Sequence, residues 1–173
     1  MPPKEPFGPG TLSLFPEAPA GSAAAQAQKS PAPEGWIVAN VDGGARGNPG
    51  PAGFGVYIRD ARGKPISQLS EYLGHRTNNF AEYSALLAAL EYAIQHGHMS
   101  LKVISDSELM VRQMTGRYKV NSVDLKPLYE KAQSLARKLE AFAIEHALRE
   151  KNYQADRLAN EAMDRGMGKK KSS

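Results

Sequence analysis

Four acidic residues fall at positions where this chain otherwise looks like protein core. Asp42 and Asp106 each end an apolar, strand-like run, and Glu82 and Asp156 each interrupt the apolar face of a helical pattern. Burying several carboxylates together costs too much free energy unless a cation compensates their charge. The chain has no cysteine, and oxygen ligands suit hard divalent ions such as Mg²⁺, with Mn²⁺ as an alternative. The pattern therefore predicts metal-dependent phosphate chemistry.

The segments around these acids predict an α/β domain. Strands are expected at 36–42, 53–60, 65–73, 101–105 and 141–147, and helices at 79–95, 107–115, 124–140 and 153–165. Short, turn-bounded links make the first three strands antiparallel. The helix-length connection that follows them favours a fourth strand parallel to the first. We therefore expect a mixed five-stranded sheet with helices on both faces.

This arrangement would bring the four acids together. Helical spacing places Glu82 and Asp156 on the packing faces of their helices. Asp42 and Asp106 come at or near the C-terminal ends of neighbouring strands, where open α/β sheets bind their ligands. A simpler interpretation treats Asp106 as a helix cap and Asp42 as a turn residue. Because it leaves Glu82 and Asp156 unexplained, we favour a shared metal site.

Length and composition indicate one folded domain with two unusual ends. The 173 residues are 41% hydrophobic and 23% charged, and the net charge of +4 is compatible with an anionic partner. Residues 1–35 are rich in proline and alanine, so we expect a disordered tail, a domain at 36–167 and a basic, frayed end at 168–173. No apolar run reaches the roughly 20 residues of a membrane span, and no secretory signal is evident. We expect a cytoplasmic monomer.

The residues around each acid resemble the motifs of type 1 ribonuclease H, in the bacterial and archaeal form. The motifs are VDGGARGNPGPAG at 41–53, TNNFAE at 77–82, SDS at 105–107 and NYQADRLA at 152–159. They occur in the family's order and span most of the expected domain. The resemblance implies a ribonuclease H-like fold and cleavage of the RNA strand of RNA–DNA hybrids, leaving 5′-phosphate and 3′-hydroxyl ends.

The resemblance also implies roles for the four acids. Asp42, Glu82, Asp106 and Asp156 would be catalytic metal ligands holding two Mg²⁺ ions about 4 Å apart. One ion would activate the attacking water, and the other would stabilise the leaving oxygen and the scissile phosphate.

Polar residues beside the acids match the family's substrate contacts. These are Asn48, Thr77, Asn78 and Asn79. Uncharged donors can read 2′-hydroxyls and minor-groove base edges, and Thr77 would contact a phosphate. The alternative makes Asn48 a turn residue and Asn78 or Asn79 a helix cap.

Three features depart from the bacterial pattern. Many members have a histidine in the loop before the fourth acid, whereas here Arg149 lies in that loop. It resembles the arginine that some members use instead, which implies a catalytic role in engaging the scissile phosphate. We interpret the nearby His146 as a residue that ends a strand. Glu108 replaces an amide, and the segment 116–121 runs almost directly into the next helix. The basic protrusion helix of some bacterial members is therefore missing.

The tail contains a short apolar segment, Thr11–Phe15, with the sequence TLSLF. It resembles the bacterial sliding-clamp-binding pentapeptide, with threonine in place of glutamine. We expect a clamp contact there, although packing on the domain and a chance match are simpler alternatives.

Two other functions fit parts of the pattern. A 3′-exonuclease on the same fold would also use acidic metal ligands, but the paired Asn78 and Asn79 and the glycine-rich first motif argue against it. A non-catalytic hybrid-binding module would not need all four acids. Cleavage assays on hybrid, single-stranded RNA and duplex DNA would separate these possibilities.

Overall fold

The computed structural model describes residues 35–168. The predicted clamp-binding segment at 11–15 and the basic end beyond residue 168 lie outside the described residues. The clamp contact therefore stays a prediction.

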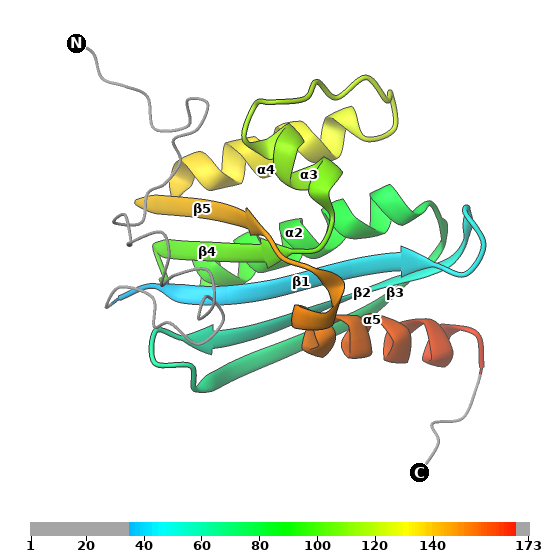
Figure 1. Ribbon diagram of the computed structural model, residues 1–173, viewed down its shortest axis with the longest axis horizontal. Coiled ribbons are helices and arrows are strands. Elements are labelled where there is room, and N and C mark those ends of the chain that lie inside the picture. Colours follow the sequence, from blue (N-terminus) through cyan, green and yellow to red (C-terminus); the bar gives the residue numbers. More distant parts are fainter. Residues whose placement is uncertain (1–34, 169–173) are drawn as a thin grey trace.

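A five-stranded sheet forms the centre of the molecule (Figure 1). Its strands are β1 (Ile37–Ala45), β2 (Gly50–Asp60), β3 (Pro65–Arg76), β4 (Ser100–Ser105) and β5 (Ala141–His146). They lie in the order β3-β2-β1-β4-β5. The first three strands pair antiparallel, whereas β4 pairs parallel with both β1 and β5. This mixed sheet confirms the predicted topology.

Helices cover both faces of the sheet, as expected (Figure 1). They are α2 (Asn78–Gln95), α3 (Glu108–Met114), α4 (Lys126–Lys138) and α5 (Tyr153–Gly166), with a short 3-10 turn η1 (Arg149–Lys151) before α5. Helix α2 packs on β1 and β2, α4 packs against α2, and α5 covers β1, β2 and β3. Within residues 35–168, no helix has the length and apolarity needed to cross a bilayer.

Side-chain alternation along β1 decides what each face of the sheet receives. Ile37, Ala39 and Val41 belong to the hydrophobic core between the sheet and α2. Because successive strand residues point to opposite faces, Asn40 and Asp42 face α5 instead. The start of β1 therefore supplies core on one side and polar groups on the other.

The first three strands are longer than the sequence predicts. Strand β1 continues past Asp42 to Ala45, β2 begins at Gly50 rather than residue 53, and β3 runs to Arg76. The apolar pattern stops at Asp42, but the backbone ladder continues because Gly43 and Gly44 still pair with β2. Asp42 thus lies within a strand, and the interpretation of Asp42 as a turn residue is wrong.

The connection between α3 and α4, residues 115–125, contains no helix. The predicted lack of a basic protrusion helix is confirmed. Charged residues in this region therefore project from a short loop rather than from a separate helical arm.

Gly43 lets β1 approach α2 closely. A Cβ atom at this position would lie 2.3 Å from the carbonyl carbon and oxygen of Ala81, which is backbone that cannot turn aside. The absence of a side chain at residue 43 therefore sets the separation between the strand that carries Asp42 and the helix that carries Glu82.

We predict that Gly43→Ala lowers the free energy of unfolding by about 1–3 kcal/mol, because it overpacks this contact. Gly44→Ala is the matched control, since a Cβ there would meet its nearest neighbours at 3.7 and 3.8 Å, which is ordinary contact. Urea unfolding of both variants measures the difference. Equal losses in the two variants would show that the close approach does not depend on Gly43.

Candidate active site

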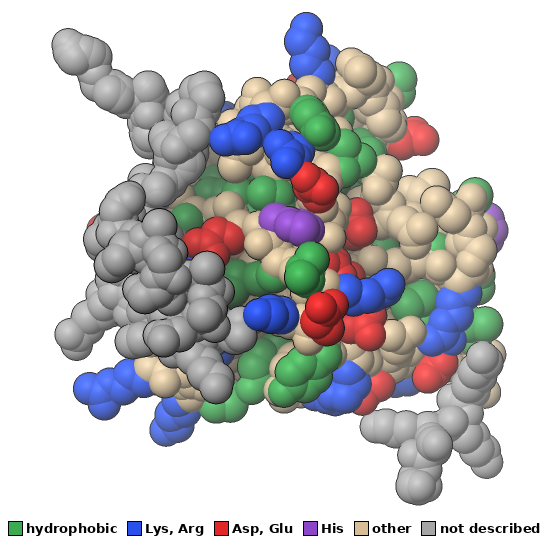
Figure 2. Space-filling view, viewed as in Figure 1, with side chains coloured by type: hydrophobic (Ala, Val, Ile, Leu, Met, Phe, Trp, Pro, Cys, Tyr) green, Lys and Arg blue, Asp and Glu red, His purple; other side chains and the backbone are tan. Residues whose placement is uncertain are grey.

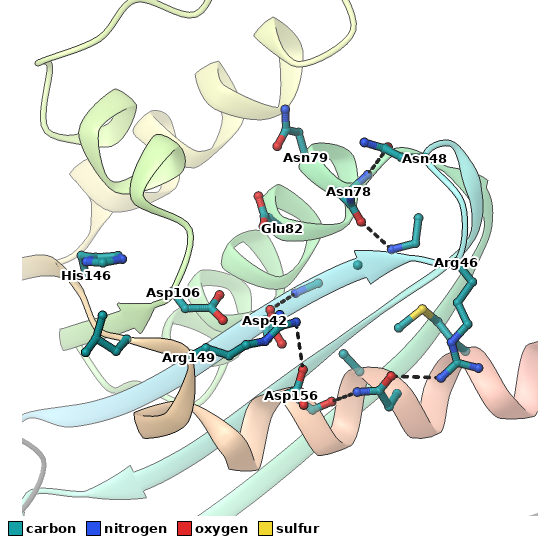
Figure 3. Close-up of a pocket in the computed structure, with 17 residues that line it drawn as sticks. Asp42, Arg46, Asn48, Asn78, Asn79, Glu82, Asp106, His146, Arg149 and Asp156 are labelled. Atoms are coloured by element: carbon teal, nitrogen blue, oxygen red, sulfur yellow. Dashed lines mark hydrogen bonds and ion pairs between the residues drawn. The ribbon is translucent and has the colours of Figure 1, made fainter.

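All four predicted acids line one pocket of about 690 Å³ (Figure 3). Asp42 comes from β1, Glu82 from an early turn of α2 and Asp106 from the residue after β4, and Asp156 lies in the first turn of α5. Strands β1 and β4 are parallel neighbours with Val41 opposite Ser105, so the acids that follow these two residues lie level with each other. The predicted convergence is confirmed.

A buried pair of asparagines fastens β1 to the start of α5. The amide nitrogen of Asn40 donates to Oδ1 of Asn152 at 2.8 Å, and the amide nitrogen of Asn152 donates to the Val41 carbonyl at 2.9 Å. The Asn152 carbonyl in turn accepts from the backbone N–H of Asp156 at 3.1 Å. This chain of hydrogen bonds holds Asp156 beside Asp42.

The role of this asparagine pair was missed from the sequence. Asn152 is only 1% exposed, and Arg59 on β2 donates to Oδ1 of Asn40. The available signal was Asn40 itself, a polar residue within the apolar run before Asp42. A buried amide in such a run needs a partner, and the partner proves to be 112 residues away.

Burial raises the pKa values of three of the acids, Asp42, Glu82 and Asp106. Burial raises the pKa of Asp42 to about 8. The negative charges of Asp106, Asp156 and Glu82 raise this pKa further, as does a side-chain hydrogen bond with Asp156. Burial likewise raises the pKa of Glu82 to about 7, against a hydrogen bond from Ser107. The pKa of Asp106 is also raised, mainly by burial. Like charges held together out of water account for these shifts.

The four acids line the pocket, but they are not spaced as a preformed metal-binding group. Within residues 35–168, no three His, Cys, Asp or Glu side chains have the spacing of a metal-binding group. Even so, the charges of Asp106, Asp156 and Glu82 all raise the pKa of Asp42, which lies among them.

Three basic residues also line the pocket, namely Arg46, His146 and Arg149. Arg149 lies in η1, and its Nη2 is 3.6 Å from Oδ1 of Asp156 with 74% of the side chain exposed. His146 is the last residue of β5, as expected, yet it also borders the pocket. The strand-end interpretation of His146 is therefore incomplete.

Two of the predicted substrate contacts, Asn48 and Asn78, form hydrogen bonds with backbone groups around the pocket. Asn48 and Asn79 line the pocket with Asn78. Oδ1 of Asn48 accepts from the backbone N–H of Asn78 at 3.0 Å, and Oδ1 of Asn78 accepts from that of Ala45 at 2.7 Å. Both amides therefore use their oxygen atoms in holding the loop between β1 and β2 against α2 (Figure 3).

The helix-cap alternatives for the site residues are wrong. Thr77 caps α2, because its Oγ1 accepts from the N–H of Phe80 at 3.1 Å, so neither Asn78 nor Asn79 has that role. Ser107 caps α3 in the same way, which removes the cap role of Asp106. Thr77 is not among the residues that line the pocket.

Glu108 lies apart from the pocket. Its carboxylate pairs with Arg112 one turn along α3, at 2.6 Å. The negative charge that departs from the bacterial pattern is therefore neutralised locally.

Comparison with known proteins agrees with this geometry. A family model described as reverse transcriptase-like matches residues 40–162. A ribonuclease H from a Jannaschia species is 33% identical over 144 residues, which cover 73% of this chain and 90% of that protein. This chain belongs to the ribonuclease H family. Its type 1 motifs and its fold thus agree with its relatives.

Other ribonuclease H relatives are more similar in sequence. The structure of LC11-RNase H1 in complex with an RNA/DNA hybrid is 45% identical, with a TM-score of 0.72 over 76% of this chain and 99% of that one. A bifunctional protein of Mycobacterium tuberculosis is 44% identical over 129 residues, 74% of this chain. The match covers only 35% of that protein's length.

We predict that Asp42→Asn stabilises this ribonuclease H in metal-free buffer, and increasingly so as pH rises. The folded-state pKa of Asp42, about 8, exceeds its ordinary 3.8. The folded protein therefore holds this proton more tightly than the unfolded chain, and wild-type stability falls with rising pH between about 4 and 8. The variant lacks this titration, so its advantage grows across that range and then levels off.

Urea unfolding between pH 5 and 9 in the presence of a chelator measures this difference. Asp124→Asn, at an exposed loop position, is the control for loss of one carboxylate. A pH-independent difference between Asp42→Asn and wild type would contradict the raised pKa.

Proposed function

We propose that this chain is a metal-dependent endonuclease that hydrolyses the RNA strand of RNA–DNA hybrids and leaves 5′-phosphate and 3′-hydroxyl ends. The observation that carries the proposal is that four acids lie beside neutral asparagines in one pocket. Asp42 comes from β1, Glu82 from α2, Asp156 from α5 and Asp106 from the residue after β4. The 45% identity to a ribonuclease H1 solved with an RNA/DNA hybrid supports the substrate class.

The donor set fits Mg²⁺, with Mn²⁺ as an alternative. Burial raises the pKa values of Asp42, Glu82 and Asp106, so a divalent cation at the four carboxylates would offset the cost of burying these negative charges. Asp42, Glu82, Asp106 and Asp156 would hold two ions, as the resemblance to the family implies. Bound Mg²⁺ supplies Lewis-acid stabilisation of the phosphate and a more acidic water.

The protein's own groups hold the acids in place and contact the substrate. Asp42 is fixed by the N–H of Gly43, which donates to its Oδ1 at 2.9 Å, and Asp156 is fixed through Asn152. Arg149 is a permanent cation, so it can bind the scissile phosphate but cannot act as a general base. Its exposure and its position beside Asp156 suit that contact.

The asparagines are suited to recognising the hybrid. The side-chain oxygens of Asn48 and Asn78 are engaged by backbone N–H groups, which leaves their NH₂ groups to donate into the pocket. Together with Asn79 they could read 2′-hydroxyls and minor-groove edges, which distinguish RNA from DNA. Thr77 can still donate its hydroxyl hydrogen to a phosphate while its oxygen caps α2.

We predict that Asp106→Asn, at saturating Mg²⁺, reduces hybrid cleavage below detection while the protein remains folded. The reason is that a neutral amide is a poor ligand for a hard cation. The measurement is cleavage of end-labelled hybrid, single-stranded RNA and duplex DNA, with circular dichroism as the test of folding. Asp124→Asn should cleave as wild type does. Near-normal cleavage by Asp106→Asn would refute the metal-ligand assignment.

We predict that Asn79→Ala weakens discrimination between hybrid and duplex DNA without loss of helix stability. Because Thr77 is the cap of α2, Thr77→Ala should lower the free energy of unfolding by about 1 kcal/mol and Asn79→Ala should not. Binding of the two duplexes, together with urea unfolding, tests both statements. Preserved discrimination in Asn79→Ala would remove this residue from substrate recognition.

A further inference from the structure

Arg46 connects the loop between β1 and β2 to α5. Its Nη1 lies 2.6 Å from Oδ1 of Asp164, and its Nη2 donates to Oδ1 of Asn160 at 2.9 Å. Residues 160 and 164 are one turn apart, so the planar guanidinium engages two successive turns of the helix. The side chain is 29% exposed, at the edge of the pocket that it also lines.

Asn160 continues this connection to a proposed metal ligand. Its amide nitrogen donates to the backbone carbonyl of Asp156 at 3.0 Å, while its oxygen accepts from Arg46 (Figure 3). The amide is therefore held at both ends. Through Asn160, a displacement of Arg46 would therefore also shift Asp156, which lies one helical turn away and carries the proposed ligand carboxylate.

On its other side, Arg46 belongs to the loop that carries Asn48. Its backbone N–H donates to the Pro51 carbonyl at 2.9 Å and closes the loop. Hydrogen bonds between Asn48 and Asn78, and between Asn78 and Ala45, then hold the loop to α2. One side of the loop thus contacts α2, and the Arg46 side chain reaches across to α5.

We propose that Arg46 is a positioning residue that couples the substrate-reading loop to the helix carrying Asp156. This inference rests on the proposed function of the pocket. Arg46 acts through Asp164 and Asn160, since its guanidinium donors are directed at α5. The alternative is that Arg46 binds a substrate phosphate and Asp164 competes with that phosphate.

The two roles predict opposite effects for Asp164→Asn. Positioning predicts that Asp164→Asn and Arg46→Ala each lower kcat/KM for hybrid roughly tenfold, as small misplacements of reacting groups do. The double variant should be no worse than Arg46→Ala alone, because Arg46→Ala already removes the contact with Asp164 together with that to Asn160. The Mg²⁺ concentration for half-maximal rate should rise, and Arg46→Lys should recover part of the loss.

Phosphate binding by Arg46 predicts a different pattern. Asp164→Asn would then tighten hybrid binding, and Arg46→Ala would reduce the salt dependence of binding. Either result overturns the positioning role. The matched control is Arg157→Ala, which removes another exposed ion pair of α5, to Glu161 at 3.0 Å, outside the pocket. Its kinetics should equal those of wild type.

Hydrogen exchange tests the connection independently of cleavage. In Asp164→Asn, the N–H groups of Ala45 and Asn78 should exchange faster than in wild type, because the loop has lost its contact with α5. Arg157→Ala should leave both rates unchanged. Unchanged exchange in Asp164→Asn would overturn the inference. Faster exchange in a protein whose wild type fails to cleave hybrid would uphold the connection and refute the proposed function.

Discussion

The burial of Asp42 beside three other carboxylates is the constraint on which the rest of the structure depends. Asp42 is only 6% exposed, and burial raises its pKa to about 8. Such a charge destabilises the fold unless protons, hydrogen bonds or a cation compensate for it. The pocket is therefore a place where the protein gives up stability for a donor set that a divalent ion would satisfy.

The scaffold holds these repelling groups mainly through close backbone packing and amide hydrogen bonds. Glycine at position 43 brings β1 against the α2 backbone, and the Asn40–Asn152 pair joins β1 to the turn before Asp156. The bonds between the two amides add no charge of their own, and the cation that joins them is Arg59, which donates to Asn40. The close backbone packing at Gly43 and the paired amides of Asn40 and Asn152 thus position the acids.

The sequence was sufficient to predict a mixed five-stranded sheet with its first three strands antiparallel, the helices on both faces and the meeting of the four acids. The sequence was not sufficient where backbone hydrogen bonds, or a partner far along the chain, determine the local structure. Apolar alternation ends at Asp42, yet hydrogen bonding extends β1 to Ala45, which no side-chain pattern reports. Either Thr77 or its asparagine neighbours could cap α2, and only geometry selects Thr77. The pairing of Asn40 with Asn152 spans 112 residues, beyond any local signal.

The charges in the pocket and on the neighbouring helix α3 bear on how a hybrid would be held. Arg46 faces Asp164 and Arg112 faces Glu108, so two cations that could attract phosphate are already paired within the chain. The connection from α3 to α4 contains no protruding helix to supply others. Surface charge then contributes less to recognition, and more rests on the asparagines beside the acids. Selectivity for a hybrid would therefore depend on how precisely the loop carrying Asn48 is placed relative to Asp156, which is the separation that Arg46 spans.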